Sequence, residues 1–384
     1  MEAAATARLG NDLNERQTTS LVRKEGLFAR WNHEYWPWYL IYLPVLPGLL
    51  IHALRSRSLV FFSNVNPAID MGGFFGERKS EIYALLPEGS YPTTLLIAQG
   101  SAQADVASRM RDVALHFPLI AKPDIGERGE GVQRVGDERA LQAVLAEQCE
   151  PLLLQALVPW THEYGLMFLR DPASGRTTLL SITGKAFLTV QGDGSSSVEV
   201  LLRATYRGRK QVERLRGYKR ELLESVPMSG ECVLVEPVGN HCRGTIFLDR
   251  WDLMAPELER ALDVLMARTT GIHYGRLDVR TENEQALREG KFTILELNGV
   301  SSEPGHIYDP SLSIFACWRE LLRHVKHLPE LSRAMSAEGA RPVTLQMLIT
   351  RCESHFGARL GMLRKLTGLF NARRTDPPPS VQLR

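Results

Sequence analysis

The chain has 384 residues and a formal net charge of +2, with 44% hydrophobic and 23% charged residues. These values are typical of a globular protein with two or three domains, and a charge this small argues against nucleic acid as a partner. The five cysteines lack the spacing of a zinc site, so we expect free thiols in a reducing cytoplasm. The first thirty residues mix acids with bases, and no secretory signal is expected there.

Residues 36–54 form an apolar stretch without Asp, Glu, Lys or Arg. Its length is just enough to span a bilayer, but Pro37, Pro44 and Pro47 argue against one regular helix. Its tryptophans and tyrosines, followed by Arg55, are typical of a segment at a membrane interface. Three interpretations stay open: burial against the protein body or a partner, which we favour; peripheral attachment at the inner face of a membrane; and a membrane span.

Beyond this stretch, hydrophobic patterns predict short strands that alternate with helices and loops. The expected strands are residues 58–63, 95–98, 119–122, 152–157, 166–169, 178–182, 186–190, 274–280 and 292–298. The expected helices are residues 79–86, 102–115 and 256–268, followed by a helical and basic region from 312 to about 370. The proline-containing residues 371–384 are expected to be disordered.

The last two expected strands carry a distinctive set of polar side chains. Because side chains alternate across a strand, Asp278 shares a face with Arg276, and Glu296 shares a face with Asn298. The polar link between the strands favours antiparallel pairing, which would bring Asp278 close to Glu296. Two carboxylates and a carboxamide on a rigid platform suit Mg²⁺. The alternative is a solvated polar face, but the apolar opposite face indicates a hairpin that rests on a core.

A lysine ends the expected strand at residues 119–122 and is followed by a glycine-rich loop. The loop contains Gly126, Gly129 and Gly131, which allow the backbone to fold closely over an anion. Alone, such a loop is usually a plain turn, and this one matches neither the P-loop nor the dinucleotide fingerprint. Together with Lys122 and the acidic hairpin, it indicates a site for a nucleotide triphosphate and its metal ion.

These motifs resemble the ATP-grasp superfamily, and within it D-alanine–D-alanine ligase and the ATP-grasp part of cyanophycin synthetase. The resemblance covers about residues 79–310. It implies a set of ATP-binding residues: Lys79, Lys122, Gly126, Arg128, Gly129, Gly131, Gln155, Leu157 and Glu163. The two lysines would hold phosphates and the loop would close over them. Gln155 and Leu157 would belong to the adenine hinge, and Glu163 would hold the ribose hydroxyls.

The resemblance also implies that Asp278, Glu296 and Asn298 are the metal ligands and that Arg276 is catalytic. The implied fold is α/β (α+β) of the ATP-grasp type. Two α/β subdomains would clasp ATP, with an abbreviated N-terminal region and a helical C-terminal extension. The expected divisions are an extension at 1–57, an abbreviated pre-grasp region at 58–95, the ATP-grasp domain at 96–315, a helical extension at 316–370 and a disordered tail at 371–384.

The implied activity is ATP- and Mg²⁺-dependent ligation, with Mn²⁺ as an alternative metal. A small-molecule carboxylate would become an acyl phosphate, which an amine or similar nucleophile then attacks. Glu303, His306 and Tyr308 are expected to contact this acceptor. Two other functions stay open: a kinase of the same fold that phosphorylates an alcohol, and a non-catalytic, membrane-attached nucleotide-binding protein. The sequence fixes neither the substrates nor the oligomeric state.

Overall fold

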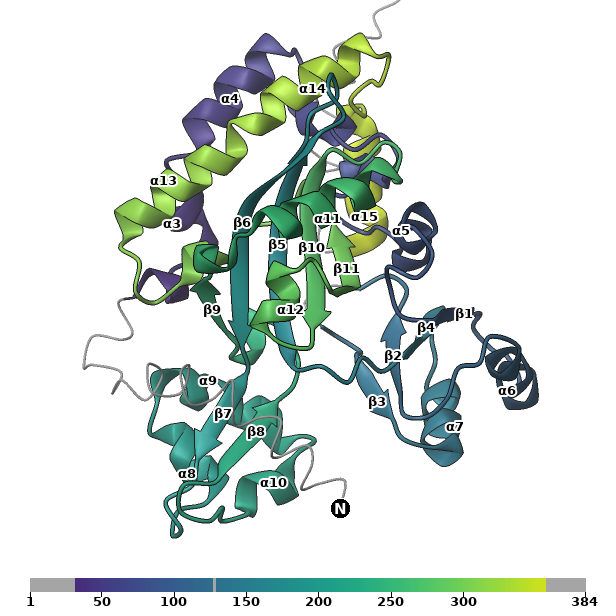
Figure 1. Cartoon of the computed structure of the whole chain (residues 1–384), viewed down its shortest axis with the longest axis vertical. Helices are drawn as coiled ribbons and strands as arrows, with labels where there is room; N and C mark the ends of the chain where they lie inside the picture. Colours follow the sequence, from purple (N-terminus) through teal and green to yellow (C-terminus); the bar gives the residue numbers. More distant parts are fainter. Residues whose placement is uncertain (1–31, 127–128, 357–384) are drawn as a thin grey trace, which may run out of the picture.

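A computed structural model describes residues 32–126 and 129–356 of the chain. Within these ranges the strands form antiparallel sheets of five, four and two strands, with helices packed around them (Figure 1). The mixed α/β class predicted from the sequence is confirmed. The domain boundaries expected from the sequence remain a proposal, and the tail at 371–384 lies outside the described residues.

The five-stranded sheet has the order β11-β10-β5-β6-β9. Its strands are β5 (His162–Arg170), β6 (Thr177–Ala186), β9 (Ile246–Asp249), β10 (Tyr274–Thr281) and β11 (Thr293–Asn298). Two helices cover one face, α11 (Pro256–Ala267) and α12 (Glu284–Arg288). Alternate strand residues make this face apolar, and Leu166, Leu277 and Leu297 all lie in its core. The predicted helix at 256–268 and the two predicted strands after it are confirmed.

The other face of this sheet changes character along its strands. Towards one end, Met167, Leu180 and Tyr274 pack against helices from the two ends of the described chain. Towards the other end the same face becomes charged, because β5 leads from Met167 to Glu163 and β10 leads from Tyr274 to Asp278. The apolar part anchors the sheet, and the charged part holds the candidate site.

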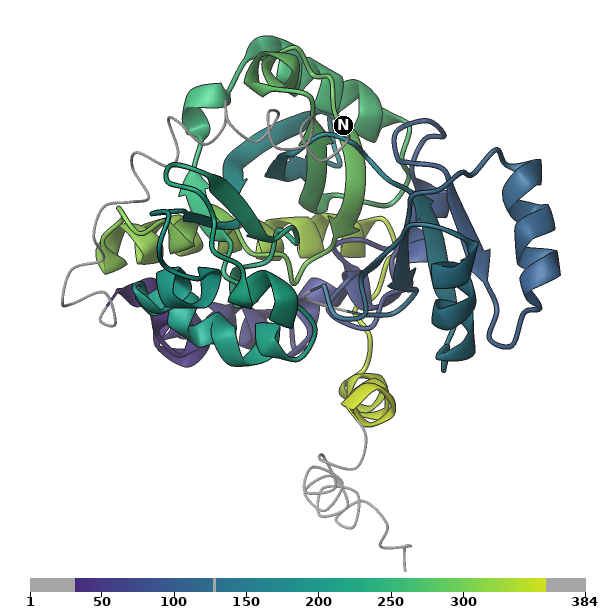
Figure 2. The ribbon, with the colours of Figure 1, turned by 90° about the horizontal axis from the view of Figure 1, so that it is seen from below.

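The four-stranded sheet lies beside the edge strand β11 (Figures 1 and 2). In the order β1-β4-β2-β3, it contains β1 (Thr94–Ile97), β2 (Leu119–Pro123), β3 (Gln133–Val135) and β4 (Leu152–Ala156). Its core is shared with α6 (Gln103–Asp112) and α7 (Glu138–Ala146). A further helix, α5 (Lys79–Leu85), connects the two sheets, because Tyr83 packs into the core of the larger sheet and donates a hydrogen bond to the Leu295 carbonyl. The elements predicted here are confirmed, with small shifts at their ends.

The two-stranded sheet pairs β7 (Leu188–Gln191) with β8 (Cys232–Glu236). Three helices cover it at the lower end of Figure 1, namely α8 (Val198–Arg203), α9 (Tyr206–Arg216) and α10 (Arg220–Glu224). Their apolar residues form a separate small core. The strands predicted at 166–169, 178–182 and 186–190 correspond to β5, β6 and β7, although β6 continues to Ala186. Two 3₁₀ turns follow β8, η5 (His241–Arg243) and η6 (Trp251–Leu253).

The N-terminal part of the described chain consists of short helices. They are η2 (His33–Tyr35), α3 (Trp38–Tyr42), α4 (Leu46–Arg55), η3 (Phe61–Asn64) and η4 (Asp70–Gly72). The predicted strand at 58–63 is wrong, because a 3₁₀ turn forms there and the Ser63 hydroxyl donates to the Val60 carbonyl. Phe61 is buried by tertiary packing instead of by a neighbouring strand. Among the described residues, every helix is too short or too polar to cross a bilayer.

The C-terminal part of the described chain is helical, as predicted from residue 312 onward. After η7 (Gly305–Tyr308) it contains α13 (Ile314–Val325), α14 (His327–Ala337) and α15 (Leu345–Phe356). Figure 1 shows α4 alongside α13 and α14, and Ala53 shares a core with Leu328 and Leu331. Helix α4 from the N-terminal part and helices α13 and α14 from the C-terminal part therefore cover the same flank of the five-stranded sheet.

Candidate functional site

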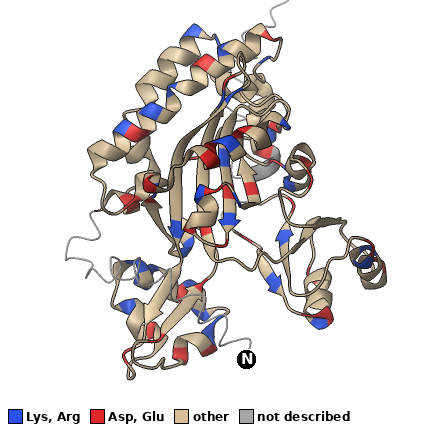
Figure 3. Ribbon diagram, viewed as in Figure 1, with Lys and Arg blue, Asp and Glu red and all other residues tan. Residues whose placement is uncertain are grey.

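The acidic hairpin is formed by β10 and β11. In their antiparallel register, Asp278 is paired with Glu296 and Arg276 with Asn298. Cross-strand partners point to the same side of a sheet, so all four side chains share one face. This is the charged end of the second face of the five-stranded sheet. Figure 3 marks positions of both signs along these strands. The predicted pairing of the two strands is confirmed.

Asp278 is buried between two cations. The Arg276 guanidinium contacts both of its oxygens, with Nε 2.8 Å from Oδ1 and Nη2 3.1 Å from Oδ2. The Nζ of Lys185 lies 3.2 Å from Oδ2. Burial raises the pKa of the Asp278 carboxyl, but Arg276 and Lys185 outweigh that effect and hold this pKa below its usual value. Asp278 is therefore an ionised carboxylate at neutral pH.

Lys185 was given no role by the sequence, yet it bridges two buried carboxylates. Its Nζ is 3.0 Å from Glu163 Oε1 and 3.2 Å from Asp278 Oδ2. Burial lowers the pKa of the Lys185 ammonium, but the two carboxylates raise it above its usual value. A single lysine in an apolar strand gives no signal of this kind in the sequence. It is the pairing of β6 with β5 that brings Lys185 to these acids.

Glu163, expected at the ribose, is held by two cations. Besides Lys185, the Nε of Arg280 lies 3.0 Å from its Oε2. These cations keep the pKa of the Glu163 carboxyl low although burial opposes them. The chain also passes very close to it, since a Cβ atom on Gly239 would come within 2.2 Å of Glu163 Oε1. Both carboxylate oxygens are therefore ion-paired, and a ribose would have to share them.

Lys122, on β2 of the four-stranded sheet, contacts the β10–β11 hairpin. Its ammonium donates to the Tyr83 hydroxyl at 2.7 Å, to Gln155 Oε1 at 2.9 Å and to the Leu295 carbonyl at 3.3 Å. The last contact places it next to Glu296, the following residue of β11. Burial lowers the pKa of Lys122 to about 8, with the nearby Glu296 acting in the opposite direction. This cation is thus largely charged at neutral pH but loses its proton within an accessible range.

The two residues expected at the adenine hinge differ in their surroundings. Gln155 is buried on β4, and its amide donates to Thr94 Oγ1 at 2.8 Å while its oxygen accepts from Lys122. Leu157 follows the end of β4 and is partly exposed. In this structure Gln155 therefore positions the Lys122 ammonium.

Lys79 reaches the same region from the start of α5. Its ammonium donates to the backbone carbonyl of Gly126 and lies 3.5 Å from Glu296 Oε1. Three lysines from three different elements thus converge on the hairpin: Lys79 from α5, Lys122 from β2 and Lys185 from β6.

The described residues of the glycine loop are held in conformations that favour glycine. Gly129 has a φ of +71°, and its carbonyl accepts a hydrogen bond from Arg243 Nη2 at 2.7 Å. Gly131 has a φ of +70°, and a Cβ atom there would lie 2.7 Å from Pro123. Side chains at either position would be strained. The loop therefore packs between Lys79 and the chain around η5, whereas Arg128 lies outside the described residues.

On the other side of Arg276 lies a cluster around Glu303. The Nη1 of Arg276 donates to the Glu303 carbonyl at 3.1 Å. The Glu303 carboxylate accepts hydrogen bonds from the Tyr308 hydroxyl, at 3.1 Å, and from the Tyr42 hydroxyl. The ring of His241 stacks on Tyr308 with centroids 5.2 Å apart. Tyr42 belongs to α3, so the N-terminal helices contribute to this end of the site, which the sequence did not indicate.

His306 and Glu34 lie outside the cluster around Glu303. The side chain of His306 faces α13, 3.7 Å from Glu320, and its contact with an acceptor stays a prediction. Glu34, which the sequence analysis did not single out, is buried in η2, where it pairs with Arg207 and lies 3.4 Å from His241. Arg207 and His241 together lower the pKa of the Glu34 carboxyl, although burial acts to raise it.

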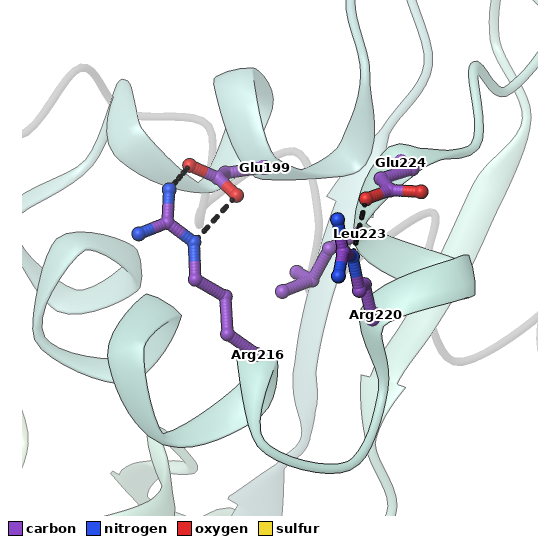
Figure 4. Close-up of a pocket in the computed structure, with 5 residues that line it drawn as sticks. All are labelled: Glu199, Arg216, Arg220, Leu223 and Glu224. Atoms are coloured by element: carbon purple, nitrogen blue, oxygen red, sulfur yellow. Dashed lines mark hydrogen bonds and ion pairs between the residues drawn. The ribbon is translucent and has the colours of Figure 1, made fainter.

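A surface depression on the small sheet's helices is lined by Glu199, Arg216, Arg220, Leu223 and Glu224 (Figure 4). Its charges are paired within the depression: Arg216 lies 2.5 Å from Glu199, and Arg220 lies 2.8 Å from Glu224. Exposed pairs of this kind are typical of a solvated surface. The depression belongs to a different layer from the hairpin, and we assign it no role.

No protein-family model matches the sequence, and no curated protein matches it. Among solved structures, the fold is similar to a bifunctional glutathione synthetase from Pasteurella multocida, with 19% identity and a TM-score of 0.38, over 66% of this chain and 36% of that chain. It is similar to D-alanine–D-alanine ligase from Bacillus anthracis, with 15% identity and a TM-score of 0.40, over 68% of this chain and 69% of that chain.

A third similar structure is the ATP-grasp ligase PsnB complexed with minimal precursor, with 12% identity and a TM-score of 0.35, over 65% of this chain and 60% of that chain. The matched proteins are of the kind that the sequence motifs resemble. Because the identities and TM-scores are low, the functional proposal rests on the geometry of the site.

Proposed function

We propose that this chain is an ATP- and Mg²⁺-dependent ligase of the ATP-grasp type, which activates a carboxylate as an acyl phosphate and joins it to an amine or a similar nucleophile. One observation carries the proposal: two carboxylates and a carboxamide on one hairpin face meet three lysines and an arginine. A nucleotide triphosphate and its divalent cation need both signs of charge in one place. The two sheets and α5 supply them together.

The hairpin offers the oxygen ligands that a hard divalent cation prefers. Asp278 and Glu296 offer carboxylate oxygens, and Asn298 offers a carboxamide oxygen. The Nδ2 of Asn298 is buried and has no hydrogen-bond partner among the described residues. A phosphate oxygen would supply the missing acceptor. Bound Mg²⁺, or Mn²⁺, would supply positive charge that neutralises the phosphates.

The nucleotide contacts follow from the same arrangement. We assign phosphate contacts to Lys79 and Lys122, add Lys185 as a third cation, and assign the cover over the phosphates to the loop at residues 126–131. The loop residues concerned are Gly126, Arg128, Gly129 and Gly131. Leu157 and Gln155 remain the proposed residues for the adenine, and Glu163 for the ribose.

The proposed chemistry proceeds in two steps. An oxygen of the substrate carboxylate attacks the γ-phosphorus of ATP and ADP leaves; the amine then attacks the acyl carbon and phosphate leaves. Arg276, oriented by both oxygens of Asp278, presents its guanidinium to the charge that spreads over the transferred group. Glu303 lies on the acceptor side, where a carboxylate would hold a substrate ammonium. The glycine loop would exclude water, which otherwise hydrolyses the acyl phosphate.

The test is ADP release with ATP and Mg²⁺ against a panel of amino acids, dipeptides and hydroxy acids. Hydroxylamine traps an acyl phosphate as a hydroxamate, whereas the kinase alternative gives a stable phosphoester. Glu296→Gln should abolish turnover, and Glu289→Gln, on the exposed link of the same hairpin, should retain it. Unchanged turnover in both Glu296→Gln and Asp278→Asn would contradict the metal assignment.

A further inference from the structure

The apolar stretch at residues 36–54 folds with much of its apolar surface facing outward. Ile41, Val45 and Ala53 are buried towards the protein. The opposite side exposes large hydrophobic side chains, namely Trp38, Tyr39, Leu40, Leu43, Leu46, Leu50, Ile51 and Leu54. Trp38 and Leu54 are each 69% exposed. A surface helix normally turns polar residues outward, so α3 and α4 show the reverse of the usual arrangement.

The neighbouring helix α13 extends this surface. Its inner side packs Cys317 and Leu321 against Ile41 and Val45. Its outer side carries, at helical spacing, Phe315, Arg319 and Leu322, and Lys326 follows at its C-terminal end. Phe315 is 73% exposed. Phe315 and Leu322 thus add to the exposed apolar side chains of α3 and α4, and we call the outward sides of these three helices together the α3–α4–α13 surface. Patches of this kind mark interaction sites.

The charges that flank this surface are basic. Residues 36–69 contain no Asp or Glu, and the exposed Arg55 and Arg57 follow the end of α4. On α13, Arg319 and Arg323 are exposed, as is Lys326 directly after it. The acid on this helix, Glu320, is partly buried and lies 3.2 Å from Arg323. A partner that suits this surface combines an apolar interior with negative charge at its boundary.

We propose that the α3–α4–α13 surface docks on a membrane that contains anionic lipids. Tryptophan and tyrosine would lie at the headgroup level, the leucines would enter the acyl boundary, and the arginines would contact lipid phosphates. With 10 residues, α4 lies in the plane of the interface and does not cross the bilayer. Of the three interpretations of the apolar stretch, this is peripheral attachment.

A second copy of the chain is a less suitable occupant. In a two-fold symmetric dimer the same surface faces itself, so basic residues of one copy lie near basic residues of the other. Like charges at such a boundary oppose association, whereas anionic headgroups neutralise them. The charge pattern therefore favours a lipid surface.

The experiment is co-sedimentation of the full chain with phosphatidylcholine vesicles, with and without phosphatidylglycerol. We expect binding to the anionic vesicles that weakens as salt is raised. Leu50→Glu combined with Leu54→Glu should lower the partition coefficient by about a hundredfold, since each buried leucine contributes about tenfold. Arg55→Gln combined with Arg319→Gln should lower binding to anionic vesicles several-fold and reduce its dependence on salt.

The matched control is Val264→Glu, an exposed apolar position on α11 at the opposite face of the sheet, which should bind vesicles like the unmodified chain. Thermal unfolding should be unchanged in the leucine variant, because both side chains are exposed. The proposal is overturned if the chain binds neither the anionic vesicles nor the vesicles of phosphatidylcholine alone. So would a dimer in sedimentation velocity that the leucine variant converts to a monomer. Neither result bears on ATP turnover, so the two proposals fail independently.

Discussion

The β10–β11 hairpin is part of the five-stranded sheet and the N-terminal helices pack on that sheet, and different kinds of contact hold the two regions in place. The hairpin is held by a ladder of backbone hydrogen bonds between strands that are close in sequence, with one irregularity between Asp278 and Val279. The N-terminal helices are held by apolar side chains packed in shared cores and by hydrogen bonds to segments far away in the sequence. Asn66 is the clearest example, because it contacts β10 across 208 positions of the chain. The hairpin therefore depends on contacts that are local in sequence, and the N-terminal region depends on contacts with distant segments.

The largest expected effect is on the charged face of the five-stranded sheet. Lys185→Met removes the ammonium between Glu163 and Asp278 and leaves two buried carboxylates with fewer partners. We expect a loss of about 3 kcal/mol in unfolding free energy and of about a hundredfold or more in turnover. Denaturant unfolding and ADP release measure the two losses. Lys291→Met, an exposed lysine on the hairpin link, is the control and should change neither.

The next effect tests how the N-terminal helices are anchored. The amide of Asn66 donates to the carbonyls of Gly72 and Tyr274 at 2.9 and 2.8 Å, and its oxygen accepts from the backbone N–H groups of His273 and Tyr274 at 2.8 and 3.0 Å. Asn66→Ala leaves these buried groups unpaired, and we expect a loss of about 3 kcal/mol.

A cap on the hairpin link provides the comparison for Asn66. Asn283 caps α12, and its side chain accepts from the Ala286 N–H at 2.8 Å. Asn283→Ala should cost about 1 kcal/mol, because water can replace an exposed cap. Urea unfolding measures both losses in unfolding free energy. Equal losses would show that the long-range contacts of Asn66 stabilise the fold no more than the local cap by Asn283.

A smaller effect concerns pH. Because burial lowers the pKa of Lys122 to about 8, its ammonium loses its proton above that pH. ATP affinity should therefore fall by about tenfold between pH 7 and pH 9, and Lys122→Arg should remove this fall because arginine stays charged. Isothermal titration across this range measures it. A fall that persists in Lys122→Arg would assign the titration to another group.

The lowered pKa of the Lys122 ammonium should also make folding stability depend on pH. An unfolded lysine has a pKa near 10.4, so between about pH 8 and that value the unfolded chain binds more protons than the folded chain. Unfolding free energy should therefore rise with pH in this window through Lys122, and Lys122→Met should remove that contribution.

The smallest effect concerns Tyr42. Tyr42→Phe removes one hydrogen bond to Glu303, and we expect the KM for the acceptor to rise about fivefold while the KM for ATP stays unchanged. Tyr39→Phe, on the exposed side of the same helix, should alter neither constant. An equal rise for ATP would mean that Tyr42 acts on the whole site instead of on the acceptor end.

Several elements of the fold could be predicted from the sequence because local patterns determine them, whereas the strands β3, β8 and β9 and the helices α7 to α10 were not predicted. Alternation of side chains fixed the shared face of Asp278 and Glu296, and apolar spacing fixed the helix at 256–268. Contacts between distant segments could not be predicted in this way. Lys185 meets Asp278 only through the order of strands in the sheet, and residues 58–63 form a turn because Phe61 packs against distant helices.

The residues of the candidate site also differ in whether a local sequence pattern could reveal them. Lys122 and the hairpin carry local signals, namely a lysine at a strand end before glycines and acids at alternating positions. Tyr42 and Glu34 carry none, since each acts through residues far along the chain, Glu303 and Arg207. The role of Gln155 in holding Lys122 also depends on the neighbouring strand, which the sequence does not reveal.

The position of Tyr42 has a practical consequence for anyone preparing this protein. Removing residues 36–54 to improve handling would also delete a hydroxyl that contacts Glu303, so a shortened chain with poor activity would say little about membranes. Recoding only the outward residues, such as Trp38, Leu50 and Leu54, to polar ones keeps Tyr42, Ile41 and Val45 in place. Such a variant allows the role of the acceptor region in activity to be measured separately from the attachment of the protein through its exposed apolar side chains.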